Sequence, residues 1–247
     1  MAAACLTWAA EAAVAAAVSS FTSQQRLYFL PDPQGQRSLR PVLAMAVERS
    51  SEEESLLYPT LVRDARFYAF ELEADRSLLA EAREKPCVIC GERLHSGNFQ
   101  RKPRGGPVGM GEDADLRYSL CCAGRECRTR YTPASLRFLG RKVYLGATVV
   151  LVAAMRHGAS PARMRTLREH LGVSRRTVER WRVWWATAFA EGPFWKAVAA
   201  SFLPAVEVAR LPASLLERFL GNEEERLILL LRFLGPITGG APTAHAR

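Results

Sequence analysis

Apolar residues recur at helical spacing through the second half of the chain and predict a series of helices. Pro161 suits the first turn of a helix, and Gly172 can take the left-handed conformation that ends one. Ser174 is a good N-cap for the helix that follows. We therefore expect helices at about 140–156, 161–171, 174–191, 215–220 and 223–234.

The first half of the chain has a weaker pattern. An Ala-rich stretch near the N-terminus favours a helix over residues 4–19, and the apolar spacing before the first cysteine pair predicts another over 72–85. Gly, Pro and Arg dominate residues 98–111, which predicts a loop. Residues 117–122 alternate as a short strand does.

Charge is concentrated in the middle of the chain. The net charge is +9 over 247 residues, yet residues 87–186 carry 19 Lys or Arg against 7 Asp or Glu. The segments on either side are slightly acidic or neutral. A basic block of this kind is typical of proteins with a polyanionic partner, although a solvated Arg-rich surface has the same composition.

The N-terminal Ala-rich stretch lacks the basic start of a secretory signal and is too weakly apolar to span a membrane. The later apolar stretch at residues 145–155 is too short to span a membrane. We therefore expect a cytoplasmic protein with no membrane partner. In that reducing compartment the six cysteines favour metal binding over a disulfide framework.

Two cysteine pairs have the spacing of a structural zinc site. Cys87 and Cys90 form a CxxC turn that Gly91 allows to close, and a second pair ends at Cys127. Strand alternation puts Cys121 and Cys122 on opposite faces, so only one can reach the metal, and we choose Cys122. The predicted ligands of one structural Zn²⁺ are Cys87, Cys90, Cys122 and Cys127.

Two alternatives accompany this assignment. His95 could replace one cysteine, although it lies in the strand leaving the first turn and is better explained as a surface residue. Cys87 and Cys90 could be a redox pair, but that chemistry favours a thioredoxin-like βαβ context, which the pattern lacks. A catalytic zinc is not expected, because four cysteines close the coordination sphere.

Residues 161–185 have the pattern of a helix-turn-helix. Met164, Leu167 and Leu171 give the first helix an inner stripe, and Val178 and Trp181 continue it on the second. The outward positions are basic, as base or phosphate contact requires. The predicted DNA contacts here are Ser174, Arg175, Arg176, Glu179, Arg180 and Arg182, with Arg163, Arg165 and Arg168 over the backbone. An amphipathic helical hairpin is the alternative.

The loop between the cysteine pairs adds a second basic element. Arg101, Lys102 and Arg104 stand within six residues of one another, with no acidic residue until Glu112. Non-specific phosphate contact and a merely solvated loop are both consistent with this composition.

The order of cysteine pairs, Arg-rich connector and helix-turn-helix resembles the DNA-binding N-terminal part of bacterial insertion-sequence transposases and their accessory proteins. The cysteine spacing is also similar to that of phage late-gene activators of the Ogr/Delta kind. The resemblance covers about residues 85–190 and implies the four cysteine ligands and the arginine contacts named above. Such transposases continue into a catalytic domain with two aspartates and a glutamate. Here Asp115 is the last aspartate, so we expect no enzyme activity.

The predicted fold is mainly α with a small β zinc ribbon, a three-helix helix-turn-helix module and C-terminal helices. The predicted function is zinc-dependent, non-catalytic binding of double-stranded DNA, as a transposition accessory factor or transcriptional regulator. A transposase or a second copy of the chain is a possible partner, the latter through Trp184 and Trp195. An RNA-binding or protein-adaptor module, or a thiol redox protein using Cys87 and Cys90, are the alternatives.

The expected divisions are an N-terminal extension (1–57), a lead-in helix and ribbon (58–135), the helix-turn-helix module (136–192), a helical segment (193–235) and a disordered tail (236–247).

Overall fold

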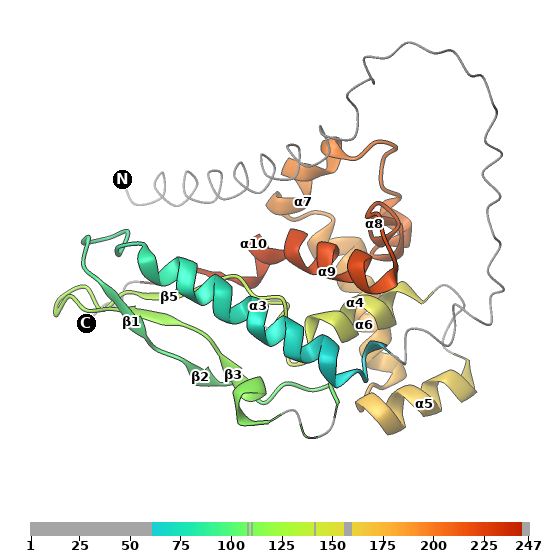
Figure 1. Ribbon diagram of the computed structural model, residues 1–247. Helices are drawn as coiled ribbons and strands as arrows, with labels where there is room; N and C mark the ends of the chain where they lie inside the picture. Colours follow the sequence, from blue (N-terminus) through green and yellow to red (C-terminus); the bar gives the residue numbers. More distant parts are fainter. Residues whose placement is uncertain (1–60, 108, 110, 141, 156–159, 244–247) are drawn as a thin grey trace, which may run out of the picture. The chain divides into compact units, whose positions relative to one another are not determined.

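The computed structural model describes residues 61–107, 109, 111–140, 142–155 and 160–243 (Figure 1). The predicted N-terminal helix and extension lie outside these residues. Helices dominate the described residues. Five short strands lie between helices α3 and α4 and a sixth follows α10, so the predicted class, mainly α with a small β part, is confirmed. The helices are α3 (Ala65–Glu84), α4 (Gly146–Ala154), α5 (Pro161–Leu171), α6 (Arg175–Trp184), α7 (Pro193–Val198), α8 (Ala213–Leu216), α9 (Glu223–Phe233) and α10 (Gly235–Thr238).

The strands form two antiparallel sheets. The larger has the order β1-β4-β5-β6, and the smaller pairs β2 with β3. Leu94 lies opposite Cys122 and Leu120 opposite Tyr131, so strand β4 pairs with β1 on one side and with β5 on the other. The strands are β1 (Leu94–Ser96), β2 (Phe99–Gln100), β3 (Leu116–Arg117), β4 (Leu120–Cys122), β5 (Arg130–Thr132) and β6 (Gly240–Thr243).

The C-terminal segment is folded, contrary to the prediction of a disordered tail from residue 236. Helix α10 is followed by β6, which pairs with β5 at Arg130 and Thr132. The Thr238 hydroxyl accepts a hydrogen bond from the Ser135 amide at 2.8 Å. The edge of the sheet at β5 gives this segment backbone partners. Residues 244–247 lie outside the described part of the chain.

Helix α3 begins at Ala65, earlier than the predicted start at residue 72. The side chain of Asp64 caps it by accepting from the Arg66 amide at 2.8 Å. Its buried face includes Glu71 and Asp75, which interrupt the apolar periodicity that the sequence pattern relies on. The first turns therefore had no recognisable apolar stripe.

Asp75 ties α3 to the segment that leads into α4. Its carboxylate accepts hydrogen bonds from the Ser135 hydroxyl at 2.6 Å, the Leu136 amide at 2.7 Å and the Arg137 guanidinium at 2.8 Å. Arg137 also donates to the Ala114 and Leu116 carbonyls. This ion pair is buried at both ends and is fully hydrogen-bonded, which is the condition under which buried charges are tolerated.

Helix α4 is shorter than predicted and is buried on every side. It starts at Gly146, not at residue 140, and all nine of its residues are buried. Val143, which falls within the predicted range, lies before the helix and is half exposed. Instead, Tyr144 forms a bridge with Arg104 of the basic loop, and Leu145 forms one with Phe138.

Helices α5 and α6 begin where the capping residues predict. Ser160 accepts from the Arg163 amide, Gly172 has φ +63°, and Ser174 accepts from the Thr177 amide. Helix α6 does not continue to Glu191 as an α-helix, because residues 185–189 form a π-helical turn. There the Thr187 hydroxyl donates to the Val183 carbonyl at 2.7 Å, a side-chain bond that competes with the regular ladder.

The C-terminal helices enclose an aromatic cluster. Phe189 lies 5.4 Å from Trp195 and 4.6 Å from Trp185 between ring centroids, and Phe202 stacks on Trp195 at 6.0 Å. Trp195 is buried in this cluster, so within the chain it is a core residue. Helix α9 starts at an Asn222–Glu225 capping box, with Glu223, Glu224 and Glu225 in its first turn. Helix α8 starts earlier than predicted and ends at Leu216.

Candidate metal centre and nucleic-acid interface

Four cysteine sulfur atoms meet at one point. The Sγ atoms of Cys87, Cys90, Cys122 and Cys127 all lie within 4.8 Å of one another, with 3.7 Å between Cys87 and Cys127 and 3.3 Å between Cys90 and Cys122. Four zinc–sulfur bonds of about 2.3 Å in a tetrahedron place the sulfurs roughly 3.8 Å apart. A disulfide needs about 2.05 Å. The arrangement therefore fits four ligands of one ion.

Each cysteine pair sits on a turn that its glycine permits. In the first turn the Gly91 amide donates to the Cys87 carbonyl at 2.8 Å, and Gly91 has φ +76°. In the second the Gly124 amide donates to the Cys122 sulfur at 3.3 Å. A Cβ on Gly124 would lie 3.3 Å from the Cys90 sulfur, tighter than most real contacts. A side chain there would crowd the four sulfurs.

The choice between Cys121 and Cys122 follows from strand β4. Cys122 is 1% exposed and faces the sulfur cluster, whereas Cys121 lies on the opposite face, pairs with His95 and Arg130, and is half buried. The alternation argument is thereby confirmed. His95 is exposed on β1 and is not part of the cluster, so it does not substitute for a cysteine.

The environment of the sulfurs is apolar on one side and hydrogen-bonding on the other. Ala82 at the end of α3 packs with Leu94, Leu120 and Cys122 in one buried cluster. Burial raises the pKa of Cys122 to about 12. The Thr129 hydroxyl, 2.9 Å from the Cys127 sulfur, holds the pKa of that thiol to about 6. A bound divalent cation favours the thiolate at every such position.

The outer face of α6 is basic and accessible. Arg175, Arg176, Glu179 and Arg180 are exposed, while Thr177, Val178 and Trp181 are buried. Arg182, predicted as a DNA contact, is half buried, and its guanidinium donates to the Met155 carbonyl at 2.8 Å. Arg182 thereby holds α6 against the end of α4.

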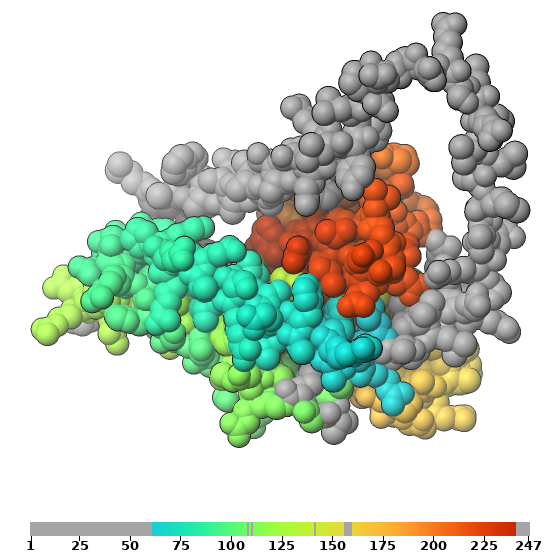
Figure 2. Space-filling view, viewed as in Figure 1, coloured from blue at the N-terminus to red at the C-terminus, as the bar shows by residue number. Residues whose placement is uncertain are grey.

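The turn between α5 and α6 is fixed by Tyr144. The Tyr144 hydroxyl donates to the Gly172 carbonyl at 2.8 Å, and its ring meets Trp181 edge-on at 5.0 Å. Val173 in the turn is fully buried. Helix α5 lies at the margin of the described unit, where Arg165 and Arg168 are exposed and Arg163 is half buried (Figure 2). The outer face of α6 therefore has a defined direction.

The basic loop is anchored to the fold. The Arg104 amide donates to Val143, and the Leu145 amide donates to Arg104, at 3.0 and 2.9 Å. Arg104 and Lys102 keep exposed side chains. Arg101 differs from them, because it is half buried and its guanidinium donates to the Lys142 carbonyl at 3.0 Å. The structure thus divides the three predicted phosphate contacts into two accessible residues and one that turns inward.

Two features were missed in the sequence. Val183 is 60% exposed and stands three residues after Arg180, on the basic face of α6. An apolar residue at an outward position breaks the amphipathic pattern of α6, and this break could have revealed the exposure of Val183. Lys142 contacts the face of Trp184, with its ammonium 3.5 Å from the ring centroid. No periodic signal marks that pairing, since it depends on the fold.

Comparison with protein-family models, curated proteins and solved structures finds no match. Within the described residues, no helix combines the length and the apolar character that crossing a membrane requires. The chemistry of the cysteine cluster and of the basic face of α6 therefore provides the basis for a functional proposal.

Proposed function

We propose that the chain is a zinc-dependent, non-catalytic protein that binds double-stranded DNA. The four cysteines hold one structural Zn²⁺, α5 and α6 act as a helix-turn-helix, and α6 enters the major groove. The observation that carries the proposal is the exposed basic face of α6, held in a fixed direction by Tyr144.

The donor set supports zinc in a structural role. Four thiolates at these separations complete a tetrahedral shell and leave no open position for water or substrate. Soft sulfur ligands in this geometry favour zinc over the hard cations Mg²⁺ and Ca²⁺. The ion would link the end of α3 and the start of β1 to the end of β4, next to the apolar cluster around Leu120.

The chemistry of α6 suits duplex recognition. Arg176 and Arg180 stand four residues apart on its exposed face, and arginine pairs in bidentate fashion with guanine in the major groove. The exposed Val183 offers an apolar contact for a thymine methyl group. Arg165 and Arg168 on α5 suit phosphate contact.

The basic loop supports the same interface. Arg104 pairs with Tyr144, and Tyr144 in turn holds the α5–α6 turn. Lys102 and Arg104 therefore lie on a segment that is tied directly to the proposed recognition unit. Additional phosphate contacts from this loop would raise affinity without adding sequence specificity.

In the cell we propose a role as a transcriptional regulator or as an accessory factor in transposition, acting in the cytoplasm. A transposase or a second copy of the chain would be the protein partner. Structured RNA is the competing polyanion.

Duplex binding is tested by fluorescence anisotropy with a site obtained by selection from random DNA. We expect log affinity to fall with log salt, with a slope near −0.9 for each phosphate neutralised. Arg180→Gln should cost about 1–3 kcal/mol on the selected site and relax the preference at one base pair. An equal excess of structured RNA should compete poorly.

Arg232→Gln is the matched control, because Arg232 is an exposed arginine on α9. It should leave affinity within twofold. A salt-independent affinity, equal losses in the Arg180 and Arg232 variants, or stronger binding of structured RNA would each contradict the proposal.

A further inference from the structure

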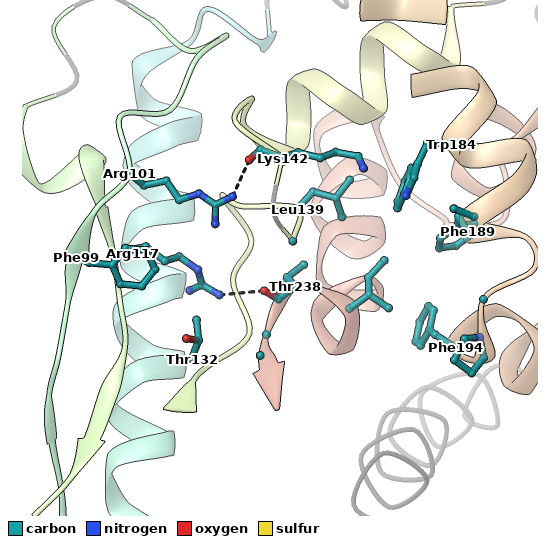
Figure 3. Close-up of a pocket in the computed structure, with 17 residues that line it drawn as sticks. Phe99, Arg101, Arg117, Thr132, Leu139, Lys142, Trp184, Phe189, Phe194 and Thr238 are labelled. Atoms are coloured by element: carbon teal, nitrogen blue, oxygen red, sulfur yellow. Dashed lines mark hydrogen bonds between the residues drawn. The ribbon is translucent and has the colours of Figure 1, made fainter. Parts of the chain in front are cut away.

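A cavity of about 850 Å³ lies between the sheets and the C-terminal helices (Figure 3). Phe99, Arg101 and Arg117 line one wall, and Trp184, Phe189 and Phe194 line the opposite wall. Leu139, Gly140, Lys142 and residues 237–240 complete it. Its size falls within the range of about 300–1,000 Å³ typical of small-molecule sites.

The charge of the cavity lining is positive. Arg101, Arg117 and Lys142 line it, and none of the described lining residues is acidic. Arg101 donates to the Lys142 carbonyl, and Arg117 donates to the Pro133 and Thr238 carbonyls at 2.6 and 3.2 Å. These partners are neutral, unlike the Asp75 carboxylate that pairs with Arg137. Arg101, Arg117 and Lys142 thus line the cavity with no salt-bridging carboxylate among the described residues.

Burial makes this arrangement costly in the absence of an anion. It lowers the pKa of Lys142 to about 8 and the pKa of Arg117 to about 10. It lowers the pKa of Arg101 as well. Perturbed cations that converge on a cavity are a recurrent property of binding sites for anions. A doubly charged anion balances three cations better than a carboxylate does.

The opposite wall is aromatic. Trp184 and Phe189 lie 5.7 Å apart, and Phe189 and Phe194 lie 6.4 Å apart between ring centroids. Lys142 reaches across toward this wall, with its ammonium over the Trp184 ring (Figure 3). Thr132 adds a hydroxyl on the arginine side. A planar ring packs favourably against such side chains, while a polar group on the same ligand can reach the cations.

We infer that this cavity binds a phosphorylated nucleoside, with its phosphate at Arg101, Arg117 and Lys142 and its base against the Phe189–Phe194 wall. The ligand is either a free mononucleotide or an unpaired nucleotide of a single strand. The site involves neither the cysteine cluster nor the outer face of α6, so it stands apart from the proposed function.

Isothermal titration of the full chain tests the ligand. Adenosine 5′-monophosphate should bind at least tenfold more tightly than adenosine or inorganic phosphate alone, because only the nucleotide uses both walls.

A 5′-phosphorylated trinucleotide d(AAA) distinguishes a free mononucleotide from a nucleotide of a single strand. If it binds at least tenfold more tightly than the mononucleotide and competes with it, the natural ligand is a strand; otherwise it is a free nucleotide. If neither the nucleotide nor the trinucleotide binds at millimolar concentration, or phosphate alone binds as tightly as the nucleotide, the inference is overturned.

Two matched pairs of variants locate the binding. Lys142→Met should weaken nucleotide binding at least tenfold, whereas Lys196→Met, on the exposed side of α7, should not change it. Ala188→Leu should block the cavity that it lines, whereas Ala186→Leu, exposed on the same turn but not lining the cavity, should bind normally. Thermal melting confirms that each variant is folded. Unchanged binding by both Lys142→Met and Ala188→Leu would overturn the placement.

Discussion

Replacement of Cys122 by serine separates a metal centre from a chance cluster of thiols. Cys122 contributes one of the four sulfurs and is 1% exposed among Ala82, Leu94 and Leu120. Serine is nearly the same size but does not supply a thiolate. The neighbouring Cys121 is the matched control, because it lies on the opposite face of the same strand and outside the cluster.

The expected magnitudes differ enough to decide the question. Without a metal, Cys122→Ser buries a hydroxyl among apolar side chains and costs about 1–3 kcal/mol. With zinc, it removes a ligand from a site whose apparent binding energy in small peptides is roughly 10–16 kcal/mol. Since the whole unfolding free energy of a domain is about 5–15 kcal/mol, loss of the ion should unfold the cysteine region. Cys121→Ser, at a half-buried position, should cost about 0.5 kcal/mol.

The assay combines zinc content by atomic absorption with thermal melting, each with and without a chelator. We expect one zinc per chain in the wild type and in Cys121→Ser, and a large loss of melting temperature on chelation in both. Cys122→Ser should contain almost no zinc and should not respond to the chelator. A metal centre at the four cysteines is refuted if wild-type protein purified with zinc in the medium contains no zinc, or if both serine variants retain zinc. Wild-type protein with no metal and a reversible Cys87–Cys90 disulfide would instead favour the redox alternative.

Three further predictions concern stability, each measured by urea unfolding. Burial raises the pKa of Glu71 well above its usual value, so the native state keeps a proton that the unfolded chain releases, and stability should fall as pH rises above about 4.5. Glu71→Leu should remove this dependence and stabilise the protein at pH 8 by about 1–3 kcal/mol; an unchanged pH profile would contradict this. Asp75→Asn should cost about 3–5 kcal/mol, because it leaves Arg137 as an uncompensated buried charge, and a loss under about 1 kcal/mol would refute that. Gly105→Ala should destabilise more than Gly109→Ala, since both have positive φ but only a Cβ on Gly105 would lie 2.9 Å from a neighbouring side chain, and equal losses would show that this contact relaxes.

Local capping chemistry made the α5–α6 region predictable. Ser160, Gly172 and Ser174 each act through bonds within a few residues, so their roles can be inferred from the sequence without knowledge of the fold. The selection of Cys122 over Cys121 was equally local, since it used only the twofold period of a strand. Such signals do not depend on distant parts of the chain.

Features that depend on distant partners were not predictable. The start of α3 escaped detection because Glu71 and Asp75 lie on its inner face, and Asp75 acquires its partners sixty residues later in the chain. The pairing of β6 with β5 has the same character. Arg182 and Arg101 resembled DNA contacts because their charge is visible in the sequence, whereas the carbonyls that bind them are not.

The same distant contacts give the proposed metal centre a physical route to the proposed DNA interface. Helix α3 packs against the cysteine cluster at Ala82 and is tied at Asp75 to the segment before α4. That segment continues to Tyr144, which holds the α5–α6 turn through Gly172. Because α3 is the first link of this route and the α5–α6 turn the last, loss of the ion should loosen α3 first and the direction of α6 afterwards. The dependence of DNA binding on zinc would then arise without any contact between the ion and DNA.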